Sequence, residues 1–428
     1  MKLEIRNGRL IDPSVADDSH EGRANLYIED ALILSVGNTA PDGFVADKII
    51  DAAGKVVAPG LVDLCARLRE PGYEHKATLE SELMAASAGG VTSLVCPPDT
   101  EPVLDEPGLV EMLKRRGWTL NQARIYPLGA LTAGLKGEKL SEMLELTEAG
   151  CIGFFQADRP IVDTSVLYRA MQYAATYGFT IWLRPEDAFL ARGGIAHDGE
   201  VASRLGLAGI PSSAETVAIA TIATLMRETG ARVHLARLSS ASGVELVRRA
   251  KAEGLAVTAD VGIHHLLLTD RDIGYFDSQY RFSPPLRSPS DRDALSAGVI
   301  DGTINAICSD HTPTDDDEKN VPFGEATPGA SGLEMLLPLT LKWAEHANVA
   351  LPTALARIST HAADVLGKSQ GRVVKGAPAD VCVFDPRAFW AVTRETLVSQ
   401  GKNTPYLARE MQGKVTHTIC AGRLVYTA

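Results

Sequence analysis

The chain has 428 residues, enough for one large domain and a smaller one. Hydrophobic residues make up 45% and charged residues 22%, as in ordinary globular proteins. The net charge of −12 argues against a nucleic acid or an anionic membrane surface as the partner. The 6 cysteines are scattered without a CxxC pair, and no apolar run reaches the roughly 18 residues of a membrane span. The composition therefore predicts a cytoplasmic protein with reduced thiols.

Both ends of the chain carry short β-rich stretches that turn signals separate. At the N-terminal end these stretches are residues 3–6, 24–28, 32–36 and 48–50. At the C-terminal end they are residues 379–384 and 415–426. Neither end holds enough apolar pattern for its own core. We therefore expect residues 1–55 and 370–428 to pair into one small composite β domain.

The middle of the chain alternates short apolar runs with amphipathic helical patterns. The apolar runs are residues 56–64, 91–96, 124–130, 150–155, 180–183, 233–238, 256–261 and 304–308. Helical patterns lie between them, for example at 76–88, 162–177, 215–228 and 243–253. This alternation predicts an α/β fold, a (β/α)8 TIM-type barrel over residues 56–369. The competing doubly wound sheet is disfavoured, because no GxGxxG motif opens a helix near the front.

Several motifs follow the apolar runs, where a barrel places its chemistry. Residues 59–72 read PGLVDLCARLREPG, and later segments read SPPLR (283–287), SDHTP (309–313), GLE (332–334) and KGAPAD (375–380). In this order they strongly resemble the dihydroorotases of the amidohydrolase superfamily, whose text is PGxxDxHxHxREPG, NPPLR, TDHAP and GLE. The resemblance covers nearly the whole chain and implies a barrel with a composite β domain.

The resemblance also implies two zinc ions, held by the HxH pair, two further histidines, a bridging carboxylate or modified lysine, and an aspartate. In this chain the corresponding positions are Cys65, Arg67, Arg184, Arg237, Gln156 and Asp310. Zinc requires imidazole, thiolate or carboxylate lone pairs, whereas a guanidinium group offers only donors and stays charged. We therefore expect no zinc cofactor and no catalysis, with Asp310 as a vestige of the metal site.

Two interpretations of the arginines remain open. In the first, Arg67, Arg184 and Arg237 compensate carboxylates that would otherwise be unpaired in a vestigial cavity, namely Asp63, Asp99, Glu186 and Asp310. In the second, they form a small-anion pocket with Arg69, which in the family grips the substrate carboxylate. Asp99, which stands where the family has asparagine, would repel an anion unless an arginine neutralises it.

The chain resembles most closely the inactive dihydroorotase-like subunits that accompany aspartate transcarbamoylase in some bacteria. That resemblance implies a structural role in pyrimidine biosynthesis, with the transcarbamoylase catalytic chain as partner in a homo- and hetero-oligomer. One alternative is a cyclic-amide hydrolase that uses one metal or none, with Asp310 as base and Arg69 as carboxylate clamp. Another is a regulatory module that binds a small anion through the arginines.

Overall fold

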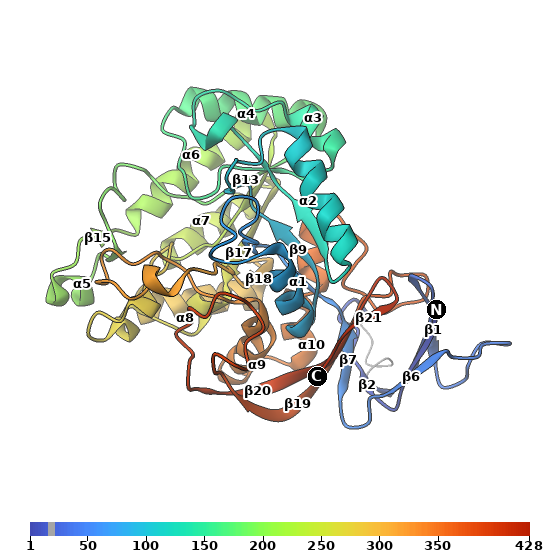
Figure 1. Cartoon of the computed structure of the whole chain (residues 1–428). Helices are drawn as coiled ribbons and strands as arrows, with labels where there is room; N and C mark the ends of the chain where they lie inside the picture. The colour runs from blue at the N-terminus through green and yellow to red at the C-terminus, as the bar shows by residue number, and fades with distance from the viewer. Residues whose placement is uncertain (16–21) are drawn as a thin grey trace.

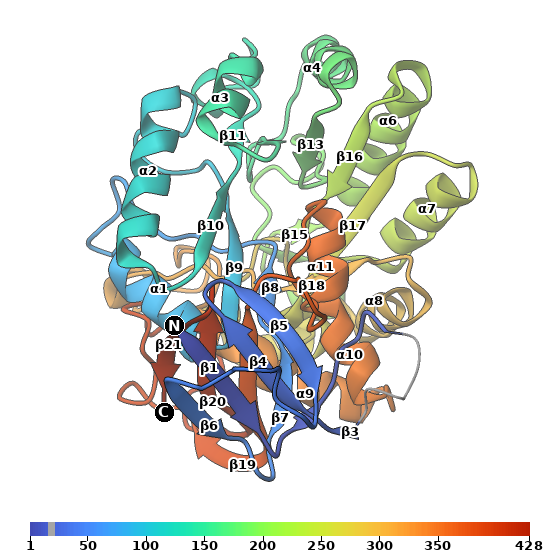
Figure 2. The same cartoon turned by 90° about the vertical axis from the view of Figure 1, so that its right-hand side faces the viewer.

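The chain forms two β-sheets at one end and a layer of parallel strands covered by helices at the other. The structure, a computed structural model, describes residues 1–15 and 22–428. Figures 1 and 2 show both termini at the β-rich end, where the first and last strands of the chain lie close together. Helices α4 (Thr164–Tyr177) and α6 (Ser213–Thr229) lie at the opposite end of the molecule.

Strands from both termini hydrogen-bond in one of the two sheets, as the sequence predicts. That sheet has the order β21-β20-β19-β7-β2-β3, and the other has the order β5-β4-β1-β6. The strands are β1 (Lys2–Arg6), β2 (Arg9–Leu10), β3 (Gly22–Arg23), β4 (Asn25–Glu29), β5 (Leu32–Gly37), β6 (Lys48–Asp51), β7 (Val56–Pro59), β19 (Val381–Ala391), β20 (Glu410–Cys420) and β21 (Arg423–Thr427). Their inward side chains, such as Leu3, Ile5 and Val381, form a hydrophobic cluster of their own.

The apolar run at residues 56–64 is divided between the two parts of the fold. Strand β7 pairs antiparallel with β19 in the terminal sheet, whereas β8 (Leu61–Asp63) pairs in parallel with β9. The break falls at Gly60, where a Cβ atom would lie 2.3 Å from the hydroxyl oxygen of Thr92. Only glycine fits this close approach of two chain segments.

All the ladders among the inner strands are parallel, and their order follows the sequence. One sheet runs β10-β9-β8 and the other β11-β12-β13-β16-β17-β18. Their strands are β9 (Val91–Cys96), β10 (Arg124–Pro127), β11 (Gly129–Ala130), β12 (Phe154–Phe155), β13 (Thr180–Leu183), β16 (Arg232–Leu235), β17 (Val257–Gly262) and β18 (Ala306–Cys308). Only Leu128 separates β10 from β11, and beyond the last strand Ala66 bridges His311 in parallel. This is the α/β arrangement that the alternating runs predict.

Helices cover the outside of these strands (Figure 2). They are α1 (Leu79–Ala88), α2 (Pro107–Leu120), α3 (Met143–Ala149), α4, α5 (Glu200–Leu205), α6, α7 (Ala241–Ala252), α8 (Pro289–Asp301), α9 (Leu336–His346), α10 (Leu351–Arg357) and α11 (Thr360–Val365). Short strands β14 (Ala196–His197) and β15 (Gly209–Ile210) pair in the segment around α5. Helix α8 begins with a capping box between Ser288 and Asp291 and ends at Gly302, which adopts the left-handed conformation.

The core consists of hydrophobic side chains that face inward from strands and helices. A small cluster fills the space among the parallel strands and includes Val62, Val95, Phe155 and Trp182. A larger cluster lies between the strands and the helices outside them. All 6 cysteines are buried free thiols distributed through these layers. No helix within residues 1–15 and 22–428 is long and apolar enough to cross a membrane.

Candidate functional site

Three arginine side chains meet at the carboxyl ends of the parallel strands. Arg67 follows β8, Arg184 follows β13 and Arg237 follows β16. All three are buried, Arg184 being the most exposed at 8%. Parallel strands point the same way, so residues that follow them share one face of the strand layer even when they are far apart in sequence. The chain thus brings together three of the positions that the motifs single out.

Asp158 joins the three arginines. Its Oδ1 accepts hydrogen bonds from Nε of Arg184 at 2.7 Å and from Nη2 of Arg237, and its Oδ2 accepts from Nη2 of Arg67 at 2.8 Å. The sequence analysis did not identify this residue. The signal that could have found it is its place shortly after β12, at another strand end on the same face.

Asp310 lies on the inner side of the cluster and is 2% exposed. Its Oδ1 accepts from Nη1 of Arg237 at 3.0 Å, and Nη1 of Arg67 lies 3.5 Å from the same oxygen. The Sγ of Cys65 is 3.8 Å from that oxygen as well. Asp310 is the one metal-ligand position of the family that this chain retains, and its carboxylate is paired with guanidinium groups.

Two further carboxylates close the cluster on its outer side. Nε of Arg67 donates to Asp99 Oδ2 at 2.7 Å. Arg184 donates through both Nη atoms to the two oxygens of Glu186, at 2.6 and 2.7 Å, a bidentate geometry that suits this pair of groups. With Asp158 and Asp310, these carboxylates outnumber the three guanidinium groups. The positive charge of the three arginines is therefore compensated within the cluster.

One sequence prediction about this region needs correction, and the residue at the bridging-ligand position, Gln156, lies apart from the arginines. Asp63 was grouped with the carboxylates that the arginines compensate, but it accepts from the amide and hydroxyl of Ser309 instead. The side chain of Gln156 bonds to Thr132 and to the carbonyl of Leu135, and none of its hydrogen bonds involves an arginine. Both residues are buried and fill their hydrogen-bonding capacity locally, so they support the walls and do not join the cluster.

Burial and the arginines shift the two central carboxyl groups in opposite directions. Burial raises the pKa of Asp158, but the guanidinium groups of Arg237, Arg67 and Arg184 outweigh burial and hold that pKa well below its ordinary value. Burial also raises the pKa of Asp310, and there Arg237 and Arg67 offset the effect only in part. Asp158 is thus the firmly ionised centre of the cluster.

The backbone at the strand ends adopts a conformation that side chains with a Cβ atom rarely take. The φ angle is +59° at Arg237, +47° at Asp310 and +63° at Arg69. Residues in this left-handed region cost on the order of 1 kcal/mol each and persist where surrounding contacts hold them. The ion pairs of Arg237 and Asp310 are such contacts.

Arg69 stands beside the cluster with most of its donors unused. Its Nε donates to the carbonyl of Pro313 at 2.8 Å. Within the described residues its two Nη atoms have no hydrogen-bond partner, although the side chain is only 9% exposed. Burial lowers the pKa of Arg69, and the neighbouring charge of Arg67 lowers it further. The two Nη groups of Arg69 are free to donate to an anion, whereas the unpartnered Nε of Arg237 is fully buried.

A second network, made of hydrogen bonds, holds the segment that follows β16. Both oxygens of the buried Glu215 accept hydrogen bonds from the backbone amides and hydroxyls of Ser239 and Ser240. The amide of Arg237 donates to Asp260 Oδ1 at 2.7 Å, and His234 Nε2 lies 2.9 Å from Oδ2 of the same aspartate. These bonds hold the turn from which Arg237 projects into the cluster.

The residues present do not fit the zinc pair that the family resemblance implies. A metal ion needs lone pairs that converge on it, but the polar atoms that converge here are guanidinium N–H donors. Across the described residues, no group of three or more histidine, cysteine, aspartate or glutamate side chains is arranged to hold a metal. Arg67, Arg184 and Arg237 place N–H donors where the family motif places zinc ligands, and their ion pairs occupy the carboxylate lone pairs that a metal would need.

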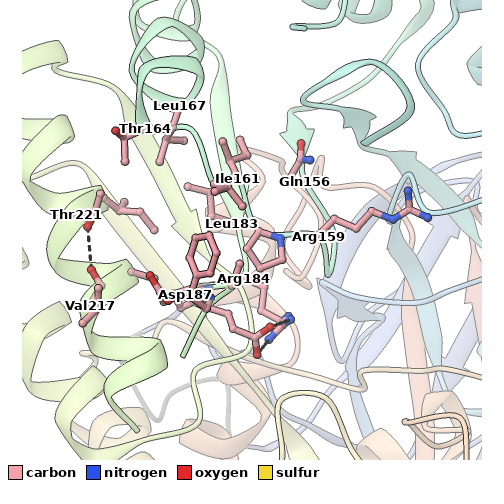
Figure 3. Close-up of a pocket in the computed structure, with 18 of the residues that line it drawn as sticks. Gln156, Arg159, Ile161, Thr164, Leu167, Leu183, Arg184, Asp187, Val217 and Thr221 are labelled. Atoms are coloured by element: carbon pink, nitrogen blue, oxygen red, sulfur yellow. Dashed lines mark hydrogen bonds and ion pairs between the residues drawn. The ribbon is translucent and has the colours of Figure 1, made fainter. Parts of the chain in front are cut away.

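A groove of about 120 Å³ opens beside the cluster, on the side of α4 and α6. Arg184 and Glu186 line its inner edge, and Leu183 and Leu167 line its apolar part. Figure 3 shows Ile161 beside these leucines, while Arg159 extends away from the groove. The groove is smaller than the roughly 300–1,000 Å³ of most small-ligand pockets.

Two known families match the chain, and together their matches span residues 54–426. Residues 54–242 match the dihydro-orotase-like family, and residues 200–426 match an amidohydrolase family. A "Dihydroorotase-like protein" of Pseudomonas aeruginosa is 45% identical over 426 residues, covering 100% of both chains. The corresponding protein of Pseudomonas putida is 43% identical and covers 100% of this chain and 99% of its own. A "Dihydroorotase" of Pelobacter propionicus is 40% identical, again over 100% of both.

Solved structures with the same fold are those of amidohydrolases. An L-hydantoinase (dihydropyrimidinase) from Arthrobacter aurescens superposes with a TM-score of 0.88, at 23% identity over 99% of this chain and 96% of its own. A D-hydantoinase gives a TM-score of 0.81 at 21% identity, over 99% and 95% of the two chains. These structures share the fold of the chain, and the match to an amidohydrolase family shows the superfamily. Within that superfamily, the chain belongs to the dihydroorotase-like proteins.

Proposed function

We propose that this dihydroorotase-like protein is not a hydrolase and serves as a structural subunit for aspartate transcarbamoylase in pyrimidine biosynthesis. The observation that carries the proposal is the arginine cluster itself. Arg67, Arg184 and Arg237 are buried at the strand ends and bound to Asp158 and Asp310. A metal-activated hydroxide is central to the family reaction, and this set of side chains cannot hold the metal.

The scaffold persists without the chemistry because its stability comes from its core and not from its site. We take the parallel strands to close into an eight-stranded barrel over residues 56–369, with residues 1–55 and 370–428 as the composite β unit. Such a body offers ample outer surface for an interface of roughly 1,200 Å² or more, the size that stable partners bury. The transcarbamoylase catalytic chain is the partner that the family resemblance implies, in a symmetric assembly with several copies of each chain.

The experiment that tests the partnership is co-expression with the transcarbamoylase catalytic chain of the same organism. The two proteins should co-elute as one large species, and the transferase should lose activity or dissociate when this chain is omitted. A transferase that is fully active alone and ignores this chain at micromolar concentration would rule out the structural role.

The absence of hydrolase chemistry needs its own measurement. Protein purified from zinc-supplemented medium should hold well below one zinc per chain, because the guanidinium groups offer a metal no lone pair and occupy those of the neighbouring carboxylates. The same protein should not interconvert carbamoyl aspartate and dihydroorotate above background. Arg67→His should not restore either property, because Arg184 and Arg237 remain. Turnover that disappears on Asp310→Ala would establish an active hydrolase instead.

A second candidate function is the binding of a small anion, and Arg69 is the observation that favours it. Its Nη donors are unused within the described part of the chain, whereas the other three arginines are compensated by carboxylates. Calorimetric titration with aspartate, carbamoyl aspartate and phosphate tests this function, with Arg69→Gln as the matched variant. Binding that is lost in the variant would favour a regulatory module.

A further inference from the structure

A pocket that shares no residue with the arginine cluster lies where α1 and α9 pack against strands β20 and β21 (Figure 1). Its volume is about 180 Å³, and Glu334 is the one acidic residue among those that line it. A water molecule takes about 30 Å³ in the liquid, so the pocket has room for roughly six non-hydrogen atoms of a ligand. We call it the Glu334 pocket. Its walls include Pro338, Trp390, Val398, Val415 and Tyr426.

Glu334 brings a carboxylate without a cationic partner to this pocket. It ends the GLE motif of residues 332–334, which neither the arginine cluster nor the proposed function uses. Its oxygens accept one backbone amide each, from Val398 and Ser399, so a lone pair remains on each oxygen. Across the described residues no side chain forms an ion pair with it, and the charge of Lys402 acts on it only while the Nζ of that lysine donates to the carbonyl of Leu397. Partly buried carboxylates usually have a cation beside them.

Two aromatic residues contribute to the walls of the pocket. Trp390 lies on β19 and Tyr426 on β21, and both pack against the large hydrophobic cluster. The Nε1 of Trp390 donates to the carbonyl of Gly413 at 3.1 Å, which fixes the orientation of the indole ring. The face of an aromatic ring attracts organic cations, because its π electrons carry partial negative charge. The pocket therefore suits a ligand with a cationic end and an apolar body.

We propose that the Glu334 pocket binds a primary ammonium group carried on a short alkyl chain. The ammonium group donates to the remaining lone pairs of Glu334, and the alkyl chain lies against Trp390, Pro338 and Val415. The carboxylate disfavours an anion, and an inorganic cation would leave the apolar walls without a contact. Free alkylamines and the lysine side chains of other proteins share this chemistry, so the test includes both sources.

The charge of Glu334 makes the binding depend on pH. Burial raises the pKa of Glu334 to about 7, and only its ionised form attracts an ammonium group. The titratable and charged groups around it are Glu82 and its partner His311, Lys402, Lys414 and Tyr426. Burial raises the pKa of Tyr426, whereas the hydrogen bonds to Glu82 outweigh burial and lower its pKa. The affinity should therefore be about tenfold weaker at pH 6 than at pH 8, and Glu334→Gln should remove this difference.

Ligand-observed NMR titration of the full chain tests the proposal. The probes are n-butylamine, Nα-acetyl-lysine methylamide and n-butanol, which is a neutral molecule of the same size as n-butylamine. Wild type should bind n-butylamine with millimolar or tighter affinity, and n-butanol at least about tenfold more weakly, because n-butanol carries no charge for the carboxylate. If the lysine derivative binds as tightly as n-butylamine, the pocket takes a lysine side chain of another protein. If it binds more weakly, the pocket takes a free amine.

Two variants examine the two parts of the pocket. Glu334→Gln removes the charge and should weaken the binding of n-butylamine at least about tenfold. Trp390→Leu removes an aromatic wall, leaves the carboxylate and its amide bonds in place, and should weaken the binding several-fold. The matched control is Glu410→Gln, which removes an exposed carboxylate of β20 that does not line the pocket. This control should bind n-butylamine as wild type does.

Three results would overturn the proposal. One is a wild-type chain that binds n-butanol as tightly as n-butylamine, or binds neither at tens of millimolar. Another is binding of n-butylamine that Glu334→Gln and Trp390→Leu both leave unchanged. The last is binding that Glu410→Gln weakens as much as they do. The measurement uses this chain alone, so its result is independent of the transcarbamoylase partnership.

Discussion

At the scale of single residues, the positions that correspond to metal ligands in the family motif form an ion cluster here. Each charge in the cluster is compensated by an opposite charge beside it. The three guanidinium groups are buried, so little solvent reaches them to replace a lost partner, although the side chain of Asp158 is 32% exposed. Asp158 contributes most to this balance, because it bonds to Arg67, Arg184 and Arg237 at once. Removing one partner from a buried charge network is far more costly than removing an exposed ion pair, since it leaves desolvated charges uncompensated.

Asp158→Asn should therefore lower the free energy of unfolding by about 3 kcal/mol in urea or thermal denaturation. The asparagine keeps the shape of the side chain and removes only its charge. The matched control is Glu253→Gln, which breaks the exposed pair with Arg227 and should cost less than about 1 kcal/mol. Equal losses in the two variants would mean that solvent, and not Asp158, compensates the arginines.

At the scale of elements, the long segment between β19 and β20 is tied to the parallel-strand part of the fold by polar groups. The amide of Asn403 donates to the carbonyls of Thr312 and Gly329, at 3.0 and 3.2 Å. In the same segment, the amides of Val398 and Ser399 donate to the side chain of Glu334, at 2.8 and 3.0 Å. Burial raises the pKa of Glu334 from 4.5 to about 7. This tie should therefore respond to pH near neutrality.

Glu334→Gln should reveal that response. The folded chain binds the Glu334 proton more tightly than the unfolded chain, so its contribution to stability is complete below about pH 4.5 and is lost as the pH rises to about 7. Relative to the variant, wild type should lose about 3 kcal/mol of unfolding free energy between pH 4.5 and pH 8, because a shift of one pKa unit is worth about 1.4 kcal/mol. A difference between the two proteins that is the same at both pH values would contradict this assignment.

The sequence predicted the elements that local pattern defines and missed those that depend on distant contacts. The apolar runs located the parallel strands, and residues that follow such strands must share a face, so the meeting of Arg67, Arg184 and Arg237 was predictable. Asp158 was not found, because it lies in an irregular turn after the two-residue strand β12, where no periodicity marks the side chain. The division of residues 56–64 at Gly60 depends on pairing with β19, which no local pattern reveals.

At the scale of the whole molecule, helices α4 and α6 and the terminal sheets lie at opposite ends (Figures 1 and 2). The terminal end is fastened to the strand layer, because Arg124, the first residue of β10, forms an ion pair with Asp380, just before β19.

The placement of the cysteines has a practical consequence for following such a molecule in solution. Burial raises the pKa of Cys96, Cys151, Cys382 and Cys420 to about 12 and raises the pKa of Cys65 and Cys308 well above its ordinary value, so the folded protein presents almost no thiolate to a reagent. These thiols lie among the parallel strands, beneath the helices and along the terminal sheet. Each becomes reactive only when its own layer opens. The rates at which a thiol-specific label attaches to the 6 positions therefore compare the opening of three regions in one unmodified chain.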